Sequence, residues 1–315
     1  MAEREPASQL DPRVERVLFE VSRQVVGKRD AALRILCAIV AGGHVLIEDV
    51  PGVGKTLLAK SLANALDLRF ARVQATADLL PSDIVGVHVY DPARQAFDFR
   101  PGPVFAEIVL VDEINRASPR AQSALLEAME EGQVTAEGHT YPLSDAFTVL
   151  ATQNPAEHEG TYALPTSELD RFLFKLHLDY PQAREEEDLL RRMSSEIRPQ
   201  PLAAAIGRQD VLTLRRESLA IHVSQPVLSY VQEIVRATRV HPDAALGASP
   251  RAGVALLRSA KVWARLHGRG HVLPDDVRAL AHDALEHRLH VRSGRPGACL
   301  DDVLASLPVP RDARA

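Results

Sequence analysis

Apolar residues near the start of the chain recur at the three- and four-residue spacing of an amphipathic helix. The repeating positions are Val14, Val17, Leu18, Val21 and Val25. Asp11 followed by Pro12 is a typical helix start, because aspartate caps the first turn and proline suits its first position. A second helical pattern over residues 30–41 stops at Gly42, a common helix end. We therefore expect two helices here, after a loose tail at residues 1–9.

Short apolar runs then alternate with helical segments. Five runs are expected to form buried strands, at residues 45–48, 70–74, 107–111, 147–152 and 174–178. Helices are expected at residues 55–66 and 119–131, the second capped by Ser118. Strands that alternate with helices favour an α/β fold with a parallel, doubly wound sheet.

Two segments interrupt this alternation. Strand-like residues 85–90 and 96–100 flank a turn at Asp91–Arg94, and residues 133–136 and 140–143 flank a turn at Glu137–His139. Both segments are predicted to be β-hairpin insertions. Surface decoration with no special role is the alternative explanation for them.

The strand pattern ends at Pro181. A charged helix is expected at residues 182–195, followed by helical patterns at residues 226–239, 250–267 and 274–290. We therefore expect an α/β core over residues 10–181 and a small all-helical domain over residues 182–292. Residues 293–315, which are rich in proline and arginine, are expected to form a weakly ordered tail.

Composition narrows the possible classes only slightly. A chain of 315 residues suits about two domains, and 46% hydrophobic with 25% charged residues is typical of a globular protein. The net charge of −5 and the pI of about 6.2 do not favour nucleic-acid binding, which usually needs a basic face. Cys37 and Cys299 form no zinc or disulfide pattern. Because no apolar run is long enough for a signal peptide or a membrane span, we expect a cytoplasmic protein without direct membrane insertion.

A glycine-rich segment directly after the first expected strand has the features of a phosphate-binding loop. Residues 49–56 read Asp-Val-Pro-Gly-Val-Gly-Lys-Thr, with Asp49 where the general motif has its first glycine. Gly52 and Gly54 let backbone N–H groups wrap around phosphates, and the following helix directs its positive end at the same anion. Lys55 is expected to contact the β- and γ-phosphates and Thr56 to bind Mg²⁺. A purely structural turn is disfavoured, because the segment follows a strand and opens a helix.

Two adjacent carboxylates supply the second part of a candidate ATPase site. The apolar run Ile108–Val111 ends in Asp112 and Glu113. Asp112 is expected to hold Mg²⁺, and Glu113 to orient and polarise the attacking water. Two solvated acids at a strand end would be unremarkable alone; behind a phosphate loop they favour ATP hydrolysis.

Several ordered stretches make the chain resemble the MoxR family of AAA+ ATPases over roughly residues 24–290. The most specific are residues 48–56, 100–105, 112–117, 122–131, 151–155, 169–172 and 247–252. The resemblance implies an AAA+ core with a five-stranded parallel sheet, a small helical lid and assembly into a ring, expected to be a hexamer. It also implies that the two hairpins are the family's inserts, which are candidates for contacting a client.

The resemblance assigns roles that spacing alone leaves open. Asn154 would position the attacking water, although an asparagine before proline is also typical of a turn. Arg171 would reach the γ-phosphate of a neighbouring subunit as an arginine finger; a surface arginine paired with a nearby carboxylate is the alternative. Arg251, at a helix start, would act as sensor 2 from the lid, and Arg116 would face the subunit interface.

These assignments give a full set of expected site residues. The expected catalytic residues are Glu113, Asp112, Asn154, Arg171 and Lys55, and Thr56 and Asp112 are the expected metal ligands. The expected nucleotide contacts are Val26, Gly27, Pro51, Gly52, Val53, Gly54, Lys55, Thr56, Leu57, Asp112, Asn154 and Arg251. The expected cofactors are therefore ATP and Mg²⁺.

The family suggests more than one biological role. A MoxR-type ATPase would remodel or activate partner proteins, often ones with a von Willebrand factor A domain, sometimes by assisting metal insertion. A magnesium-chelatase-like motor subunit is the alternative within the same clade. A transcription activator or nucleic-acid motor is less favoured, because the sequence has no Gly-Ala-Phe-Thr-Gly-Ala loop. A non-enzymatic ATP-binding scaffold is disfavoured by the intact set of Lys55, Glu113 and Arg171.

Overall fold

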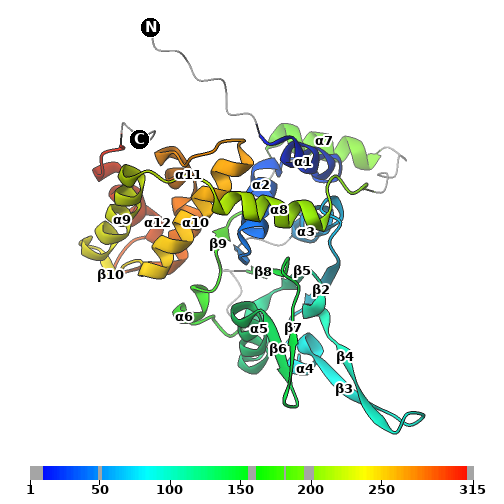
Figure 1. Cartoon of the computed structure of the whole chain (residues 1–315). Helices are drawn as coiled ribbons and strands as arrows, with labels where there is room; N and C mark the ends of the chain where they lie inside the picture. Colours follow the sequence, from blue (N-terminus) through cyan, green and yellow to red (C-terminus); the bar gives the residue numbers. More distant parts are fainter. Residues whose placement is uncertain (1–9, 49–51, 155–160, 181, 195–201, 311–315) are drawn as a thin grey trace.

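The computed structural model describes residues 10–48, 52–154, 161–180, 182–194 and 202–310. Its centre is a five-stranded sheet in the order β2-β5-β8-β1-β9 (Figure 1). All four strand pairings are parallel, which confirms the predicted fold class. The strands are β1 Val45–Glu48, β2 Phe70–Gln74, β5 Ile108–Asp112, β8 Thr148–Gln153 and β9 Phe174–Leu176.

Alternate residues of these strands enter two different hydrophobic cores, because side chains along a strand point to opposite faces. Val45, Ile47 and Leu110 pack on the face covered by α1 Pro12–Gln24, α2 Arg29–Ala41 and α3 Lys55–Ala65. Leu46, Val109 and Val111 pack on the opposite face, against α4 Pro81–Val85 and α5 Pro119–Glu131. The near-continuous apolar runs seen in the sequence therefore reflect strands that are buried on both sides.

The helix boundaries follow the local capping chemistry. The Asp11 side chain accepts a hydrogen bond from the Arg13 amide at 2.8 Å, with Pro12 in the first turn. Ser118 caps α5 in the same way, accepting from the Ala121 amide at 3.3 Å. Gly42 ends α2 in the left-handed conformation, with φ of 65°, which glycine adopts without steric cost.

Both predicted hairpins are present and they contact each other. The first joins β3 Gly86–Asp91 to β4 Ala96–Pro101, and the second joins β6 Gln133–Ala136 to β7 His139–Pro142. They extend from the same side of the core (Figure 1). The ring of Phe99 in the first hairpin stacks on Tyr141 of the second, with centroids 4.1 Å apart. The hairpins therefore form one paired projection.

The second half of the chain is mainly helical, as predicted. Its helices are α7 Ala183–Ser194, α8 Arg208–Leu219, α9 Gln225–Val240, α10 Pro250–Leu266, α11 Pro274–Leu285 and α12 Pro296–Ser306. Helix α8 was not predicted, and the pattern expected to run to residue 290 ends at Leu285. A short 3-10 helix, Glu286–Arg288, follows α11, and β10 Ala244–Leu246 pairs with β11 His290–Val291. The hydrophobic core continues from one face of the sheet into this helical domain.

The prediction of a weakly ordered tail from residue 293 is wrong for residues 296–306. These residues form α12, whose Cys299, Leu300 and Val303 are buried. The Arg278 guanidinium donates a hydrogen bond to the Leu304 carbonyl at 2.9 Å and fixes the end of this helix. The proline and arginine content obscured a short apolar face, which is stable here because α9 and α11 cover it.

Helix α7 lies near the first helices of the core (Figure 1). The Glu185 side chain stands against Gly27, just beyond the end of α1. The predicted boundary at residue 182 therefore stays a prediction. In the part of the chain that the structure describes, no helix is long and apolar enough to cross a bilayer.

Candidate nucleotide-binding site

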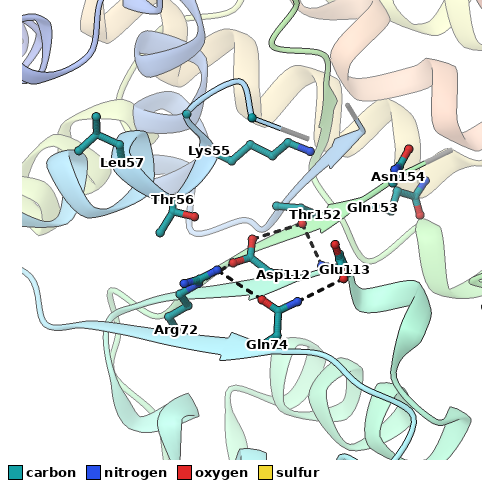
Figure 2. A pocket seen from close by; sticks show the side chains of 12 residues that line it. Lys55, Thr56, Leu57, Arg72, Gln74, Asp112, Glu113, Thr152, Gln153 and Asn154 are labelled. Atoms are coloured by element: carbon teal, nitrogen blue, oxygen red, sulfur yellow. Dashed lines mark hydrogen bonds and ion pairs between the residues drawn. The ribbon is translucent and has the colours of Figure 1, made fainter. Parts of the chain in front are cut away.

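A cavity of about 420 Å³ opens where the carboxyl ends of β1, β5 and β8 meet (Figure 2). In open parallel sheets this edge is where ligands usually bind, because loops and helix starts converge there. The cavity is lined by Gly52, Gly54, Lys55, Thr56, Leu57, Arg72, Gln74, Asp112, Glu113, Thr152, Gln153 and Asn154. The structure thus brings together most of the described residues that the sequence assigned to phosphate binding and hydrolysis.

The phosphate loop has the backbone that its sequence requires. Gly52 and Gly54 both have φ of +88°, and apart from the adjacent residues no described atom lies within 4 Å of where a side chain would stand on either glycine. The glycines are therefore needed for backbone conformation, and they leave the N–H groups of the loop accessible. Helix α3 starts at Lys55 directly after Gly54, so its positive end faces the cavity. Asp49 and Pro51 lie outside the described residues.

The two carboxylates occupy different environments. Asp112 is mostly buried, and its Oδ2 pairs with Nε of Arg72 at 2.6 Å. Its Oδ1 lies 3.4 Å from the hydroxyl of Thr152. Carboxylate and hydroxyl oxygens are the ligands that Mg²⁺ prefers, so Asp112 together with Thr56 provides a suitable donor set.

Glu113 is held in a strained conformation. It has φ of 58° and ψ of 50°, a left-handed backbone that costs a glutamate about 1–3 kcal/mol. Its amide donates to the Thr152 hydroxyl at 2.9 Å, and its carboxylate accepts from Gln74 at 3.2 Å and from Arg116 at 3.2 Å. These contacts direct the carboxylate into the cavity, as Figure 2 shows.

Four residues that line this site were not predicted from the sequence. Arg72 and Gln74 come from the neighbouring strand β2, and Thr152 and Gln153 come from β8. The available signal was the alternation of Arg72 and Gln74 within an otherwise apolar strand, which places both side chains on one face. Nothing local distinguishes Thr152 from any buried threonine in a strand.

Asn154 follows the end of β8, the central strand, and lines the cavity. Its position fits the role that the family resemblance implies. Val26, Gly27 and Val53 are not among the lining residues. Near the first two, the buried Lys28 ammonium donates to the carbonyls of Leu178 and Asp179, both at 2.5 Å, and ties this turn to the chain after β9.

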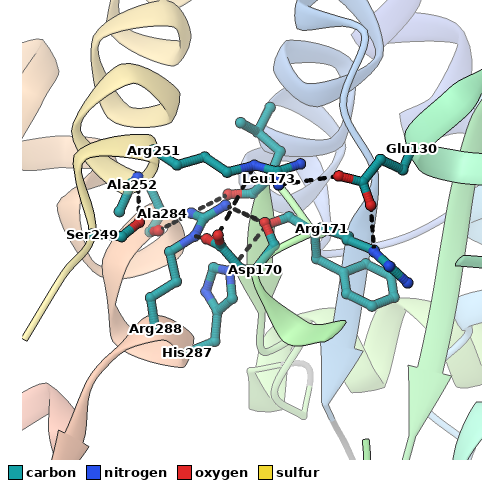
Figure 3. A network of polar contacts seen from close by, with 11 residues as sticks. Glu130, Asp170, Arg171, Leu173, Ser249, Arg251, Ala252, Ala284, His287 and Arg288 are labelled. Atoms are coloured by element: carbon teal, nitrogen blue, oxygen red, sulfur yellow. Dashed lines mark hydrogen bonds and ion pairs between the residues drawn. The ribbon is translucent and has the colours of Figure 1, made fainter. Parts of the chain in front are cut away.

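Arg171 and Arg251 lie together, outside the cavity (Figure 3). Both pair with Glu130 of α5, Arg171 at 2.8 Å and Arg251 at 3.2 Å. Arg251 stands in the first turn of α10, and its Nε is 3.9 Å from Oδ2 of Asp170. The expected contact between Arg251 and nucleotide is therefore not made with the pocket of the same chain in this arrangement.

Strand direction explains why these arginines are separated from the phosphate loop. Strand β9 runs parallel to β1, and Phe174 pairs with Val45 at the amino end of both strands. Arg171 precedes Phe174, whereas the phosphate loop follows the other end of β1, at Glu48. Four strand residues span about 13 Å. The two arginines therefore lie at the amino ends of the parallel strands, and the cavity lies at their carboxyl ends.

Comparison with known proteins agrees with this arrangement. Residues 44–174 match a model of the ATPase family associated with various cellular activities (AAA), and residues 236–304 match the AAA lid domain. The protein YeaC of Bacillus subtilis is 46% identical over 96% of both chains. A chaperone named MoxR1 in Mycobacterium tuberculosis is 41% identical over 88% of this chain and 75% of its own length.

A crystal structure from Cytophaga hutchinsonii superimposes with a TM-score of 0.89 and 38% sequence identity, covering 95% of each chain. That extent of coverage includes both the sheet with its phosphate loop and the helical domain. The two family matches fall on the same two parts of the chain. This chain therefore belongs to the MoxR family of AAA ATPases.

Proposed function

We propose that this protein hydrolyses MgATP in a ring of identical subunits, a hexamer, and uses the cycle to remodel or activate partner proteins in the cytoplasm. The observation that carries the proposal is the convergence of four chain segments on one cavity. The phosphate loop, the acidic pair, Asn154 and the Arg72–Gln74 strand all meet there. A relative named as a chaperone supports the remodelling role.

The residues of the cavity divide the work of hydrolysis between them. Lys55 and the backbone N–H groups of the loop would bind the β- and γ-phosphates. Glu113, oriented by Gln74 and Thr152, would polarise the attacking water, and Asn154 would help to position it. Thr56 and Asp112 would hold Mg²⁺, which supplies charge stabilisation on the phosphate oxygens when bound.

A single chain does not complete this site, because Arg171 and Arg251 lie at the other edge of its sheet. We propose that both arginines serve the γ-phosphate of the adjacent subunit in the ring. Cationic help of this kind contributes on the order of 10³–10⁵ in rate in other NTPases. Glu130 would hold the pair until a neighbouring nucleotide is present.

Steady-state ATPase assays test the proposal. Lys55→Ala should lose ATP binding in calorimetry, and Glu113→Gln should bind ATP without turnover. Arg171→Ala should keep its affinity but lose turnover by about 10³-fold. Mixed with Glu113→Gln it should regain activity, because each variant then supplies what the other lacks. Wild-type protein that neither binds ATP nor releases phosphate would refute the whole assignment.

The partner is proposed from the family alone, as a protein with a von Willebrand factor A domain, with assisted metal insertion as one outcome. The paired hairpins offer a projecting surface for such a client. A pull-down with Glu113→Gln in the presence of ATP would capture it. Recovery of a magnesium chelatase or of nucleic acid would favour the alternative roles instead.

A further inference from the structure

We propose that Arg288 is a positioning residue that fixes the loop carrying Arg171, so that the helical domain sets whether Arg171 can serve the neighbouring subunit. The inference rests on the proposed role of Arg171, whose loop Arg288 holds in place. Arg288 belongs to the 3-10 helix Glu286–Arg288, which follows α11. Arg171 lies between α6 Thr166–Leu169 and β9 of the core.

The Arg288 guanidinium donates several hydrogen bonds to this loop. Its Nε pairs with Oδ1 of Asp170 at 2.6 Å. Its Nη2 donates to the carbonyls of Asp170 at 3.1 Å and of Phe172 at 2.8 Å, and its Nη1 donates to that of Leu173 at 3.3 Å. These acceptors lie on both sides of Arg171 in the sequence (Figure 3). The backbone is therefore held directly before and directly after the arginine finger.

Because Arg288 is buried, its contact with the loop requires an arginine. Only 5% of the Arg288 side chain is exposed, and it also donates to the Ala284 carbonyl. Burial lowers the pKa of Arg288, and the Asp170 carboxylate opposes that shift. A buried guanidinium is costly unless its donors are satisfied, and the planar fork of arginine satisfies several acceptors at once. A lysine ammonium would keep the charge but could not reach the same set of carbonyls.

His287 reinforces the same loop. Its Nε2 lies 3.0 Å from the Phe172 carbonyl, in hydrogen-bonding distance. Burial, followed by the charge of Arg288, lowers the pKa of His287 to about 3. The ring is therefore neutral at physiological pH, with one N–H available to donate to the Phe172 carbonyl.

The Arg171 side chain leaves the loop on the side opposite these anchors and reaches Glu130 (Figure 3). Arg251, also from the helical domain, pairs with the same carboxylate. The helical domain thus contacts both the backbone of the finger loop and the carboxylate that receives the finger. A movement of this domain relative to the sheet would displace Arg171.

The test uses Arg288→Lys in the full chain. We expect nucleotide affinity and KM for ATP to stay unchanged, while kcat falls by about 10–100-fold, the usual cost of a misplaced catalytic group. Mixing Arg288→Lys with Glu113→Gln should restore turnover, because the second variant supplies an intact finger. Mixing it with Arg171→Ala should not, because neither variant then provides one.

Arg215→Lys is the matched control. Arg215 also lies in the helical part of the chain and also donates to main-chain carbonyls, those of Val40 and Ile39 at 2.9 Å and that of Asp145, but it makes no hydrogen bond to residues 170–173. Its replacement should lower thermal stability without affecting kcat. If Arg288→Lys does not fold, as judged by circular dichroism, Asp170→Asn replaces it, because that change keeps the main-chain hydrogen bonds of Arg288 and removes the carboxylate charge that faces Arg288 and, at 3.9 Å, Arg251.

Wild-type turnover in Arg288→Lys, or a loss that Glu113→Gln cannot restore, would overturn the inference. A loss of kcat equal to that of Arg215→Lys would overturn it too, because Arg288 would then only join two parts of the fold. Full activity of Arg171→Ala would instead show that the proposed trans site fails, a separate outcome that is visible in its own assay.

Discussion

Replacing Thr152 by valine should slow ATP hydrolysis strongly while leaving the fold intact. Thr152 is 3% exposed, and its hydroxyl accepts a hydrogen bond from the Glu113 amide at 2.9 Å. The same hydroxyl lies 3.4 Å from Asp112. Valine has the same shape, so the substitution removes only this polar link between the two carboxylates.

The expected magnitudes follow from the contacts. An unpaired amide at Glu113 costs about 1–3 kcal/mol of stability. The left-handed backbone of Glu113 stores strain of similar size, about 1–3 kcal/mol, which a rotated backbone would release. The net loss of unfolding free energy should therefore not exceed about 3 kcal/mol. The carboxylate would leave its position, however, and a displacement of about 1 Å can cost on the order of 10²-fold in kcat.

The assay compares Thr152→Val with Thr148→Val in the same strand. Thr148 is 0% exposed, and its hydroxyl has no hydrogen-bond partner within the described residues. Its replacement should keep kcat and maintain or raise the unfolding free energy, because it removes a buried polar group without a partner. Phosphate release at saturating MgATP gives kcat, and urea unfolding gives stability. Equal kcat for the two valine variants would refute the proposed link.

Three further results are expected. Arg72→Gln, which removes the 2.6 Å ion pair with Asp112, should lower the Mg²⁺ concentration needed for half-maximal hydrolysis; a raised requirement in an Mg²⁺ titration would contradict this. His287 is neutral in the fold, with its pKa lowered by burial to about 3, so its contribution to stability is present above pH 6.5 and lost as pH falls toward 3. Between pH 7 and pH 5, the unfolding free energy of His287→Gln, measured in urea, should therefore fall by about 2 kcal/mol less than that of the wild type. An unchanged dependence of unfolding free energy on pH would oppose this. Tyr141→Ala should loosen the first hairpin by removing its 4.1 Å stack with Phe99, seen as faster proteolysis at residues 91–95 with ATPase activity retained; equal cleavage rates would argue against the pairing.

His282→Gln is a control for the pH dependence expected of His287→Gln. The pKa of His282 is raised by its hydrogen bond to Glu286, with burial opposing and Asp301 adding to the shift. Its contribution is therefore fully present below pH 6.5 and lost as pH rises through the raised pKa, the opposite sign to His287. His282→Gln should therefore lower the unfolding free energy by a nearly constant amount below pH 6.5 and change its slope with pH only above 6.5, whereas His287→Gln changes the slope only below 6.5.

The strands, the phosphate loop and the acidic pair could all be predicted from the sequence. Each depends on neighbouring residues: apolar runs predict buried strands, glycines with positive φ form the loop, and Asp112 with Glu113 ends a strand. Lys55 and the two acids were expected to form one ATPase site, and the cavity contains all three because parallel strands bring their carboxyl ends to one edge of the sheet.

The residues that assist these groups, and the positions of the arginines, depend on tertiary packing. Arg72, Gln74 and Thr152 reach the acids because β2 and β8 flank β5, a strand order that no local pattern encodes. Arg171 and Arg251 meet on Glu130 at the opposite edge, and Arg288 anchors the loop from more than a hundred residues away. Periodicity and capping act within a few residues, whereas these contacts depend on how strands and helices from distant parts of the chain pack together.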